Sequence, residues 1–311
     1  MSDTAAVAAS PLVSVVIPAF DAAATIERAV TSVLAQDYRH IEVILVDDGS
    51  RDDTAARAES LRDPRLRVLR LPDNRGASAA TNAGIAACRG SLVAFQDADD
   101  EWLPGKLSKQ VAAIQRDPAI SFVCTGLTHI YPDRRIDDIA GFPPGPELWK
   151  QLLARTLVAK PCVLARRDAL RRAGPFDESL ATAEDQDMWI RLALRGVVVE
   201  IPEILVLVHR QPGSLSAGPA DRAAADVMAM LDRHLRALGA RLSRAERRHI
   251  LATRYAALGR SCYGEGHLLR GLRYLGLASV YGSDPRGILF YILQAAPPTR
   301  WLKRQYRRVR L

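Results

Sequence analysis

After its first ten residues the chain alternates between short apolar runs and amphipathic segments. The apolar runs have the length of strands and end in proline, glycine or acidic residues, whereas the segments between them repeat apolar residues at the spacing of one helix face. Strands that alternate with helices in this way predict a parallel sheet with crossover helices, and hence an α/β fold. The expected strands are 13–17, 41–46, 66–71 and 92–95, and the expected helices are 22–36, 52 or 53 to 61, and 77–88.

Downstream of the fourth strand the pattern is less regular. A Pro- and Gly-rich stretch over 131–146 is expected to be irregular, and a helix is expected to begin near Glu184. We expect separate strands over 197–201 and 204–208, because Pro202 lies between them and cannot donate to a strand ladder. Further helix is predicted over 107–115, and further strand over 120–127 and 161–165.

These patterns divide the chain into three regions. Residues 1–10 are expected to be a disordered N-terminus, and residues 11–216 hold the alternating strands and helices. A Gly-, Pro- and Ser-rich linker near 216–220 leads to residues 221–311, whose pattern is helical throughout. We therefore expect a Rossmann-like, mostly parallel sheet flanked by helices, with a C-terminal helical appendage.

Composition narrows the class of protein. Hydrophobic residues make up 48% of the chain and charged residues 25%, as in ordinary globular proteins. The 4 cysteines are isolated, so neither a zinc site nor a disulfide framework is indicated. The first ten residues lack the features of a signal peptide, and no run approaches the roughly 18 apolar residues of a membrane span. A cytoplasmic setting is the simplest expectation.

Charge is unevenly distributed along the chain. From Asp221 onward there are 18 basic and 6 acidic residues, a balance of +12, which leaves 25 and 29, a balance of −4, for the residues before it. The last helical segment also carries Trp301 and Tyr306 among its basic residues, which is typical of a segment that lies on an anionic membrane surface. The alternative is a helical bundle with a solvated basic end. Nucleic-acid binding is not expected, because no recognisable nucleic-acid fold accompanies the charge.

Acidic side chains stand at the ends of expected elements. Asp47 and Asp48 follow the second strand, Asp97 and Asp99 follow the fourth, and Asp185 lies near the start of a helix. Unpaired carboxylates cost several kcal/mol to bury, whereas hard divalent cations prefer oxygen ligands. The carboxyl ends of parallel strands are also where ligands bind in such sheets. The pattern therefore favours a metal and diphosphate site at this edge.

Each acid also has a purely structural interpretation. The Asp-Asp-Gly-Ser stretch over 47–50 can form an Asx turn, and acids near Asp185 favour a helix start. Asp100 is expected to cap a helix that begins near Leu103. No G-x-G-x-x-G follows the first strand and no P-loop motif is present, so the common dinucleotide and nucleoside-triphosphate folds are unsupported. The histidines are scattered without metal-ligand spacing.

Six motifs stand out over residues 11–215: Val13-Ser-Val-Val-Ile-Pro-Ala-Phe20, Val46-Asp-Asp-Gly-Ser50, Asn74-Arg-Gly76, Asn82-Ala-Gly84, Phe95-Gln-Asp-Ala-Asp-Asp-Glu-Trp102 and Glu184-Asp185. Taken together, they resemble those of family 2 glycosyltransferases, which have the GT-A fold. The resemblance implies transfer of a sugar from a nucleoside diphosphate donor with inversion at the anomeric carbon.

By matching position, the resemblance implies roles for single residues. Asp99 would be the direct ligand of a Mg²⁺ or Mn²⁺ ion, and Asp97 would lie near the ribose or a metal-bound water. Asp185 would be the general base, with Glu184 beside it as a further candidate. The nucleoside pocket would be lined by Pro18, Ala19, Phe20 and Asp48.

Two departures from the family pattern concern the donor site. Where relatives often have Ala-Arg-Asn, this chain has Ala80-Thr-Asn82, so an Arg contact to the donor is either missing or supplied elsewhere, with Arg75 as the candidate. Where many relatives have a histidine before a P-x-S-x-S run, this chain has Gln211, with His209 two residues earlier. Both are candidates for a further metal or phosphate contact.

The expected function is a metal-dependent, inverting transfer of a sugar from a UDP-, dTDP- or GDP-sugar to a hydroxyl of a glycan or lipid-linked acceptor. Surface polysaccharide or glycolipid synthesis would place the enzyme in the cytoplasm or on the inner face of the plasma membrane. One in-line displacement needs a single carboxylate base and no nucleophile, consistent with the lack of a Ser–His–Asp arrangement. The alternatives are a non-catalytic scaffold that binds nucleotide sugars and a nucleotidyltransferase, although the latter would need an Arg-containing, Gly-rich loop after the first strand.

Overall fold

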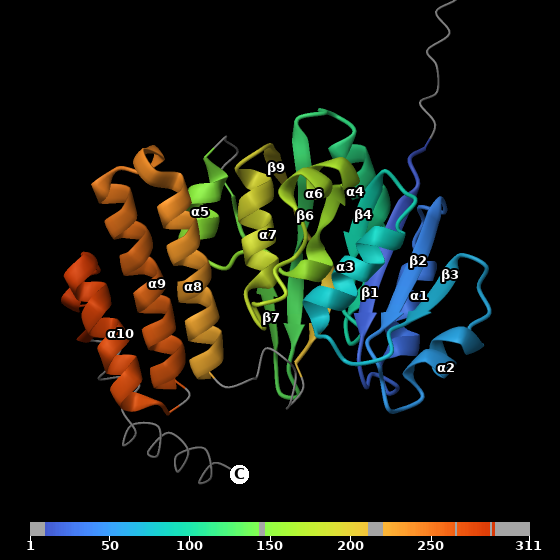
Figure 1. Ribbon diagram of the computed structural model, residues 1–311, viewed down its shortest axis with the longest axis horizontal. Coiled ribbons are helices and arrows are strands. Elements are labelled where there is room, and N and C mark those ends of the chain that lie inside the picture. The colour runs from blue at the N-terminus through green and yellow to red at the C-terminus, as the bar shows by residue number, and fades with distance from the viewer. Residues whose placement is uncertain (1–9, 143–146, 211–219, 265, 287, 290–311) are drawn as a thin grey trace, which may run out of the picture. The chain divides into compact units, whose positions relative to one another are not determined.

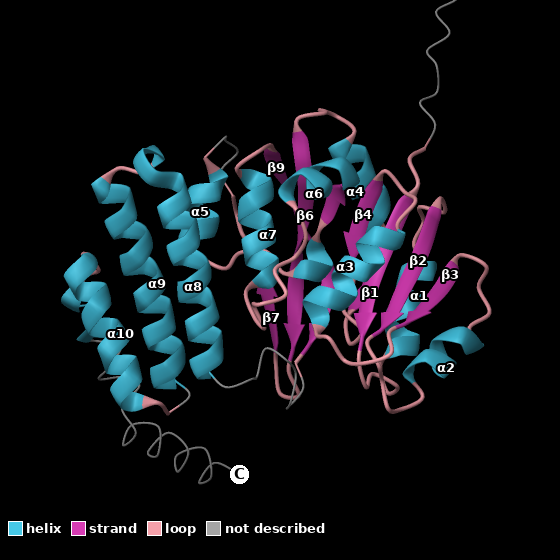
Figure 2. Ribbon diagram, in the orientation of Figure 1, coloured by secondary structure: helices cyan, strands magenta, loops and turns pink. Residues whose placement is uncertain are grey.

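A computed structural model describes residues 10–142, 147–210, 220–264, 266–286 and 288–289 of the chain (Figure 1). It divides into two compact units, residues 1–149 with 157–217, and residues 150–156 with 218–311. The first unit holds a mixed sheet with helices packed on it, and the second is helical (Figure 2). The extents of the functional domains stay predictions.

The N-terminal half of the first unit is a parallel sheet in the strand order β3-β2-β1-β4. All seven residues of β1 and of β2 are buried, as expected for central strands covered on both faces. Helix α3 lies close against β1, because a Cβ atom on Gly84 would come within 2.4 Å of a methyl carbon of Val16. The predicted elements are confirmed here as β1 (Val13–Ala19), α1 (Ile26–Leu34), β2 (Ile41–Asp47), α2 (Thr54–Ser60), β3 (Leu66–Arg70), α3 (Ala77–Ala87) and β4 (Leu92–Phe95).

Beyond β4 the sheet continues in the order β8-β6-β9-β5, with β7 paired to β6. Strands β6 and β9 run parallel to each other, whereas β8 is antiparallel to both β4 and β6. The predicted α/β fold is confirmed. The elements are β5 (Glu101–Trp102), α4 (Lys106–Ile114), β6 (Ile120–Ile130), β7 (Arg135–Asp138), α5 (Leu148–Ala154), the 3-10 turn η1 (Lys160–Cys162), β8 (Leu164–Arg166), α6 (Arg167–Ala173), α7 (Glu184–Ala193) and β9 (Val197–His209).

Three local predictions in this half were wrong. Pro202 does not divide two strands: β9 is continuous, and Pro202 and Glu203 fall where the register with β6 jumps, so the missing N–H breaks no ladder bond. The stretch predicted as strand 161–165 begins as η1, with Pro161 in its first turn. The stretch expected to be irregular contains β7, which forms a hairpin with β6, while residues 143–146 lie outside the described part.

An aromatic cluster connects the end of β4 to α7. The ring of Phe95 lies 5.7 Å, edge to face, from the rings of both Phe176 and Trp189, and Phe176 and Trp189 are 6.1 Å apart. All three side chains are at most 1% exposed. Edge-to-face packing of this kind contributes roughly 0.5–1.5 kcal/mol per pair beyond burial. The cluster therefore fixes the start of α7 relative to the acidic loop after β4.

The second unit is helical, as predicted for the part of it that the structure describes. Its helices are α8 (Ala220–Leu238), α9 (Arg244–Gly264) and α10 (Leu268–Tyr281), with the 3-10 turn η3 (Gly239–Arg241) between the first two. Helices α9 and α10 approach closely, because a Cβ on Gly271 would lie 2.7 Å from the backbone nitrogen of Tyr263. Within the described residues, no helix combines the length and apolar character needed to cross a membrane.

Candidate active site

The candidate site lies at the carboxyl edge of the parallel strands. The chain leaves β1 toward β2 and β3, and then returns to β4 on the other side of β1. The loops after β1 and β4 therefore diverge, which is the point where open α/β sheets bind ligands. The predicted donor-site residues lie at the end of β1 and in the loops after β1, β2, β3 and β4.

Pro18, Ala19 and Phe20 mark the end of β1. Pro18 and Ala19 lie in register with Val46 and Asp47 of β2, and both are buried. Phe20, just past the strand, is 42% exposed. An exposed aromatic ring at this edge offers a face on which a nucleobase can stack. The predicted role of these three residues in the nucleoside pocket stays a prediction.

Asp47 and Asp48 are neighbours in sequence, but their carboxylates bind different segments of the chain. Asp47 stabilises the turn after β2, since its Oδ1 accepts the backbone N–H of Ser50, three residues on, at 3.1 Å. Asp48 instead reaches to the loop between β3 and α3, where its two oxygens accept the N–H groups of Arg75 and Gly76 at 2.9 and 2.8 Å. Asp48 is 2% exposed, and its carboxylate shapes the loop before α3 through these two bonds.

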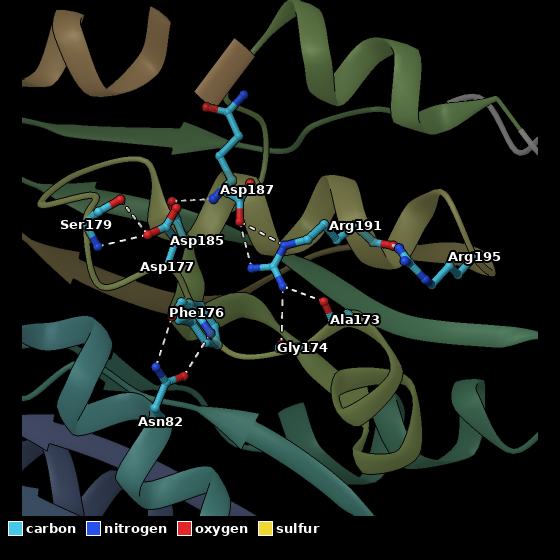
Figure 3. A network of polar contacts seen from close by, with 11 residues as sticks. Asn82, Ala173, Gly174, Phe176, Asp177, Ser179, Asp185, Asp187, Arg191 and Arg195 are labelled. Atoms are coloured by element: carbon cyan, nitrogen blue, oxygen red, sulfur yellow. Dashed lines mark hydrogen bonds and ion pairs between the residues drawn. The ribbon is translucent and has the colours of Figure 1, made fainter. Parts of the chain in front are cut away.

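Arg75 therefore lies beside Asp48 through its backbone, and its side chain points elsewhere. Its guanidinium is more than half exposed and lies 3.6 Å from the carboxylate of Glu178. Asn82, the residue retained from the family's Ala-Arg-Asn motif, binds the same loop: it donates to the carbonyl of Phe176 at 3.0 Å and accepts the N–H of Phe176 at 2.8 Å (Figure 3).

The acids after β4 form a cluster held by distant elements. Burial first, and repulsion from Asp97 second, raise the pKa of Asp99. The carbonyl of Asp99 accepts a bond of 2.6 Å from Arg28 of α1. The prediction that Asp100 caps a helix is wrong, because α4 begins only at Lys106 and Asp100 Oδ1 accepts the N–H of His209 at 3.0 Å. Burial and the charges of Asp97 and Asp99 raise the pKa of Asp100 to about 8.

His209 lies at the end of β9, next to this cluster. Burial, and then the charge of Arg28, lower its pKa, so the imidazole is neutral at neutral pH. Its Nε2 is buried without a hydrogen-bond partner among the described residues, and the nearest carboxylate oxygen, on Glu101, is 3.7 Å away. Gln211, the other candidate, lies outside the described residues.

A divalent cation fits the chemistry of this cluster. Asp99 has a carboxylate destabilised by burial and by Asp97, and His209 has an orphaned neutral nitrogen close enough to interact with Asp99. Both are ligand types that Mn²⁺ accepts. Within the described ranges, however, no three His, Cys, Asp or Glu side chains are already grouped to hold a metal ion. A nucleoside diphosphate would therefore have to supply further oxygens, as is usual for Mg²⁺ sites.

Asp185 and Glu184 open helix α7. Ala183 before them takes a left-handed conformation with φ of 65°, which is uncommon for a residue with a side chain. Asp185 Oδ1 accepts the N–H of Gln186 at 2.6 Å. Burial and the neighbouring charge of Glu184 raise the pKa of Asp185 to about 7, whereas that N–H and Lys160 oppose the shift. This pKa suits a general base at neutral pH.

Helix α7 is fixed at the far side of these acids by an ion pair. Arg191 binds Asp187 of the same helix, with 2.7 Å between Nη2 and Oδ2, and it donates to the carbonyls of Ala173 and Gly174 at the end of α6 (Figure 3). Asp187 and Arg191 are nearly buried. The acids at the start of α7 are thus presented by a helix that is anchored at several points.

Two basic residues of the site were missed by sequence reasoning. Lys160 lies 3.1 Å from Asp97, and its side chain is 9% exposed. Burial alone would lower its pKa, but the attraction of Asp97, Glu184 and Asp185 outweighs burial, so its pKa is raised and it stays cationic. A lone lysine inside the apolar run 157–165 was a usable signal. Arg28 gave none, because it is an ordinary polar position on an amphipathic helix.

Comparison with known sequences identifies the family. A family model described as glycosyl transferase family 2 matches residues 14–174. Among curated relatives, an uncharacterised Mycobacterium tuberculosis protein, MT1568, is 31% identical over 63% of this chain and 66% of its own length. A putative teichuronic acid biosynthesis glycosyltransferase of Bacillus subtilis, TuaG, is 33% identical over 60% of this chain and 73% of its own.

A third relative is the Escherichia coli UDP-Glc:alpha-D-GlcNAc-diphosphoundecaprenol beta-1,3-glucosyltransferase WfaP. It is 27% identical over 66% of this chain and 80% of its own length. The chain therefore spans about two thirds to four fifths of the length of these relatives.

Solved structures agree on the fold. Residues 1–349 of S. aureus TarS in complex with UDP-GlcNAc superpose with a TM-score of 0.66 at 21% identity, covering 92% of this chain and 81% of that one. The mannosyltransferase PcManGT of Pyrobaculum calidifontis, in complex with GDP-Man and Mn²⁺, gives a TM-score of 0.63 at 20% identity, with 94% and 83% covered. The predicted family and fold are confirmed: the chain belongs to glycosyl transferase family 2.

Proposed function

We propose that the chain transfers a sugar, with inversion, from a nucleoside diphosphate sugar to a hydroxyl of a glycan or lipid-linked acceptor in cell-surface polysaccharide synthesis. The observation that supports this most is that the first unit carries two separate groups of acidic side chains. One follows β4 and has an orphaned histidine beside it, and the other, with a raised pKa, opens α7. The names of the relatives point to the same class of pathway.

The donor would bind at the ends of β1, β2 and β4. Phe20 offers a ring for the base, Asp48 offers a fixed carboxylate, and Asp97, held by Lys160, offers an acceptor for the ribose. Asp99, with His209 beside it, would hold Mg²⁺ or Mn²⁺. When bound there, the ion would neutralise charge on the leaving diphosphate without proton transfer.

The acceptor hydroxyl must lose its proton as it attacks the sugar. Asp185 suits this step because its raised pKa leaves it part-ionised near neutrality and gives it a useful affinity for the proton. The N–H of Gln186 holds one carboxylate oxygen, so the other can face the hydroxyl. Attack from the side opposite the leaving group, in one displacement, inverts the anomeric carbon.

The direct test is donor turnover by the full chain. UDP-, dTDP- and GDP-sugars would be incubated with Mn²⁺, and release of the nucleoside diphosphate measured with and without added acceptor. We expect D99N and D185N to lose activity by about 100-fold or more, as for other groups that act in the transition state. The matched control is D63N, which removes a carboxylate paired with Arg65 in the loop before β3. Full activity of D99N and D185N would refute the assignment.

Metal dependence and inversion need their own measurements. Chelation with EDTA should abolish turnover, and Mn²⁺ or Mg²⁺ should restore it. Proton NMR of the product should show the anomeric configuration opposite to that of the donor sugar. A non-catalytic scaffold is the remaining alternative: it would bind the donor in a thermal-shift assay without releasing nucleotide under any of these conditions.

We also propose that the second unit contacts an anionic membrane. On α10, Leu269, Leu272 and Val280 are 87%, 41% and 69% exposed, and the exposed Arg273 lies among them. Exposed apolar residues beside a basic one suit the interface of a bilayer with acidic lipids. In flotation with vesicles of phosphatidylcholine and phosphatidylglycerol, L269D should weaken binding, whereas A237D, the same charge on an exposed position of α8, should not. Equal binding by both variants would refute this surface.

A further inference from the structure

Lys160 is a buried lysine beside the acids that follow β4. Its side chain is 9% exposed, and its Nζ lies 3.1 Å from Oδ1 of Asp97, the acid predicted to serve the donor. Its charge also acts on Glu184 and Asp185, the acids at the start of α7. A buried ammonium is costly unless it is paired, so its position is a specific feature of this site.

The backbone that carries Lys160 is held by two buried side chains. Trp102 donates through Nε1 to the carbonyl of Pro161 at 3.1 Å. Gln110 of α4 donates to the carbonyl of Cys162 at 2.8 Å and to that of Val123 in β6 at 3.1 Å. The turn η1 is thereby fixed to both α4 and the central sheet. Lys160 is therefore delivered to the acids by a rigid support, and it does not reach them as a flexible surface side chain.

The charges around Lys160 are unbalanced. Asp97, Glu184 and Asp185 are three carboxylates, and the charge of Asp97 raises the pKa of both Glu184 and Asp185. Lys160 is the cation whose attraction opposes this repulsion at all three. Without it, like charges in a poorly solvated site would push the end of β4 and the start of α7 apart.

We propose that Lys160 is a positioning residue of the sugar transfer, a shared counter-ion that holds the donor-side Asp97 and the acceptor-side Glu184 and Asp185 in one working arrangement. The inference rests on the proposed function, because it assigns a task to the acids that carry it. It adds a connection that neither acidic motif contains: the donor site and the base are coupled through a residue on a third element, η1.

This coupling makes a distinctive prediction for substitutions. K160M removes the charge while keeping a similar side-chain length, so Asp97 loses its partner and Asp185 loses its alignment. We expect kcat/KM to fall by on the order of 100-fold, which is typical when a reacting group is displaced by about 1 Å. The loss should appear both in the donor KM, through Asp97, and in kcat, through Asp185. K160R should recover part of it, because it restores the charge with a different shape.

The matched control is the other buried lysine of the same unit. Lys106 is fully buried, but its ammonium donates to Oε1 of Gln110 at 2.9 Å and lies 3.7 Å from the centre of the Trp102 ring. K106M is the same chemical change at a similar depth, against an amide and an indole in place of acids. Gln110 and Trp102 also hold η1, so K106M reports the effect of a loosened support alone, and we expect its loss of kcat/KM to be much smaller than that of K160M.

A double-mutant cycle on donor binding gives a readout apart from turnover. Binding of the donor nucleotide with Mn²⁺ would be measured by calorimetry for wild type, K160M, D97N and the double variant, each checked for folding by circular dichroism. If Lys160 acts through Asp97, the double variant should bind about as weakly as the weaker single variant, because residues that act as a unit are not additive. If K160M does not fold, K160Q takes its place in the same cycle.

The outcomes separate this inference from the proposed function. Additive losses in the cycle, or a K160M enzyme with the kcat/KM of wild type, would overturn the role of Lys160 while leaving the transferase intact. A wild-type protein that binds donors but turns none over would overturn the proposed function, and the binding cycle would then still decide whether Lys160 and Asp97 act together.

Discussion

The side chain of Asp100 accepts the backbone N–H of His209, with 3.0 Å between the two atoms. The bond fastens the loop after β4 to the last residue of β9, more than a hundred positions later in the chain. It lies next to the short pairing of β5 with β9, which brings Glu101 opposite Leu207. The conformation of the loop that carries the proposed metal ligand Asp99 is thus set by an element that follows Asp185 in sequence.

Two substitutions of Asp100 should therefore separate the effect of its hydrogen bond to His209 from the effect of its negative charge. D100N keeps an oxygen that can accept from His209, so we expect stability close to that of wild type and most of the activity. D100A leaves a buried N–H unsatisfied and should lower the free energy of unfolding by about 1–3 kcal/mol, with a larger loss of donor binding. Urea unfolding and donor titration of both variants would check this. Equal behaviour of D100N and D100A would contradict the role of the bond.

The pH dependence of turnover should report Asp185. A general base must be ionised, and burial with the charge of Glu184 raises the pKa of Asp185 to about 7. Activity should therefore rise with pH through neutrality and fall below it. E184Q removes the repulsion that raises this pKa, so its acidic limb should move to lower pH. The measurement is kcat/KM against pH for both proteins, and an unmoved limb would show that another group controls the profile.

Asn82 should matter more for activity than its distance from the acids suggests. It binds both backbone groups of Phe176 and the carboxylate of Glu178, and Phe176 packs on Trp189 of α7. N82A should cost about 1–3 kcal/mol of stability, because the N–H of Phe176 loses its acceptor. It should also lower kcat by loosening the loop that leads to Asp185. Thermal unfolding and kcat of N82A, with S179A as a control in the same loop, would test this.

The sequence could predict elements whose pattern is local. Strands β1 to β4 and their helices have clear periodicity, and the acids at strand ends could be placed at one edge because parallel strands share an edge. Pro202 misled the prediction because a proline is tolerated where the register jumps, and register depends on the partner strand β6. The two-residue strand β5 is too short to have a pattern.

The contacts that complete the candidate site also depend on segments far apart in sequence, so they could not be predicted. Lys160 meets Asp97 and Arg28 meets Asp99 only after the sheet has assembled, and no sequence spacing encodes either pair. Asp48 could be singled out as a site residue, but its bonds to Arg75 and Gly76 depend on the path of a loop. The acids could be found from the sequence, because unpaired carboxylates at the ends of buried strands cost free energy unless they bind something. The cations beside them, Lys160 and Arg28, were missed.

Lys106 makes a prediction for stability that is independent of catalysis. Burial lowers the pKa of its ammonium from 10.5 to about 7. Between these values the unfolded chain binds more protons than the folded one, so the free energy of unfolding should rise with pH by about 1.4 kcal/mol per unit from this group. Below pH 7 the penalty for burying the charge is present in full, and above the unfolded pKa it is absent.

K106M should remove this contribution. Methionine titrates nowhere in the range and suits the contact with Trp102, although Gln110 loses a donor, which offsets part of the gain. We expect K106M to be the more stable protein at pH 7 and its advantage to shrink as the pH rises toward 9. Urea unfolding of both proteins at several pH values measures the difference directly, and contributions from groups that do not interact with Lys106 cancel. Parallel stability curves would mean that Lys106 keeps its charge throughout, held by Gln110 and the indole ring.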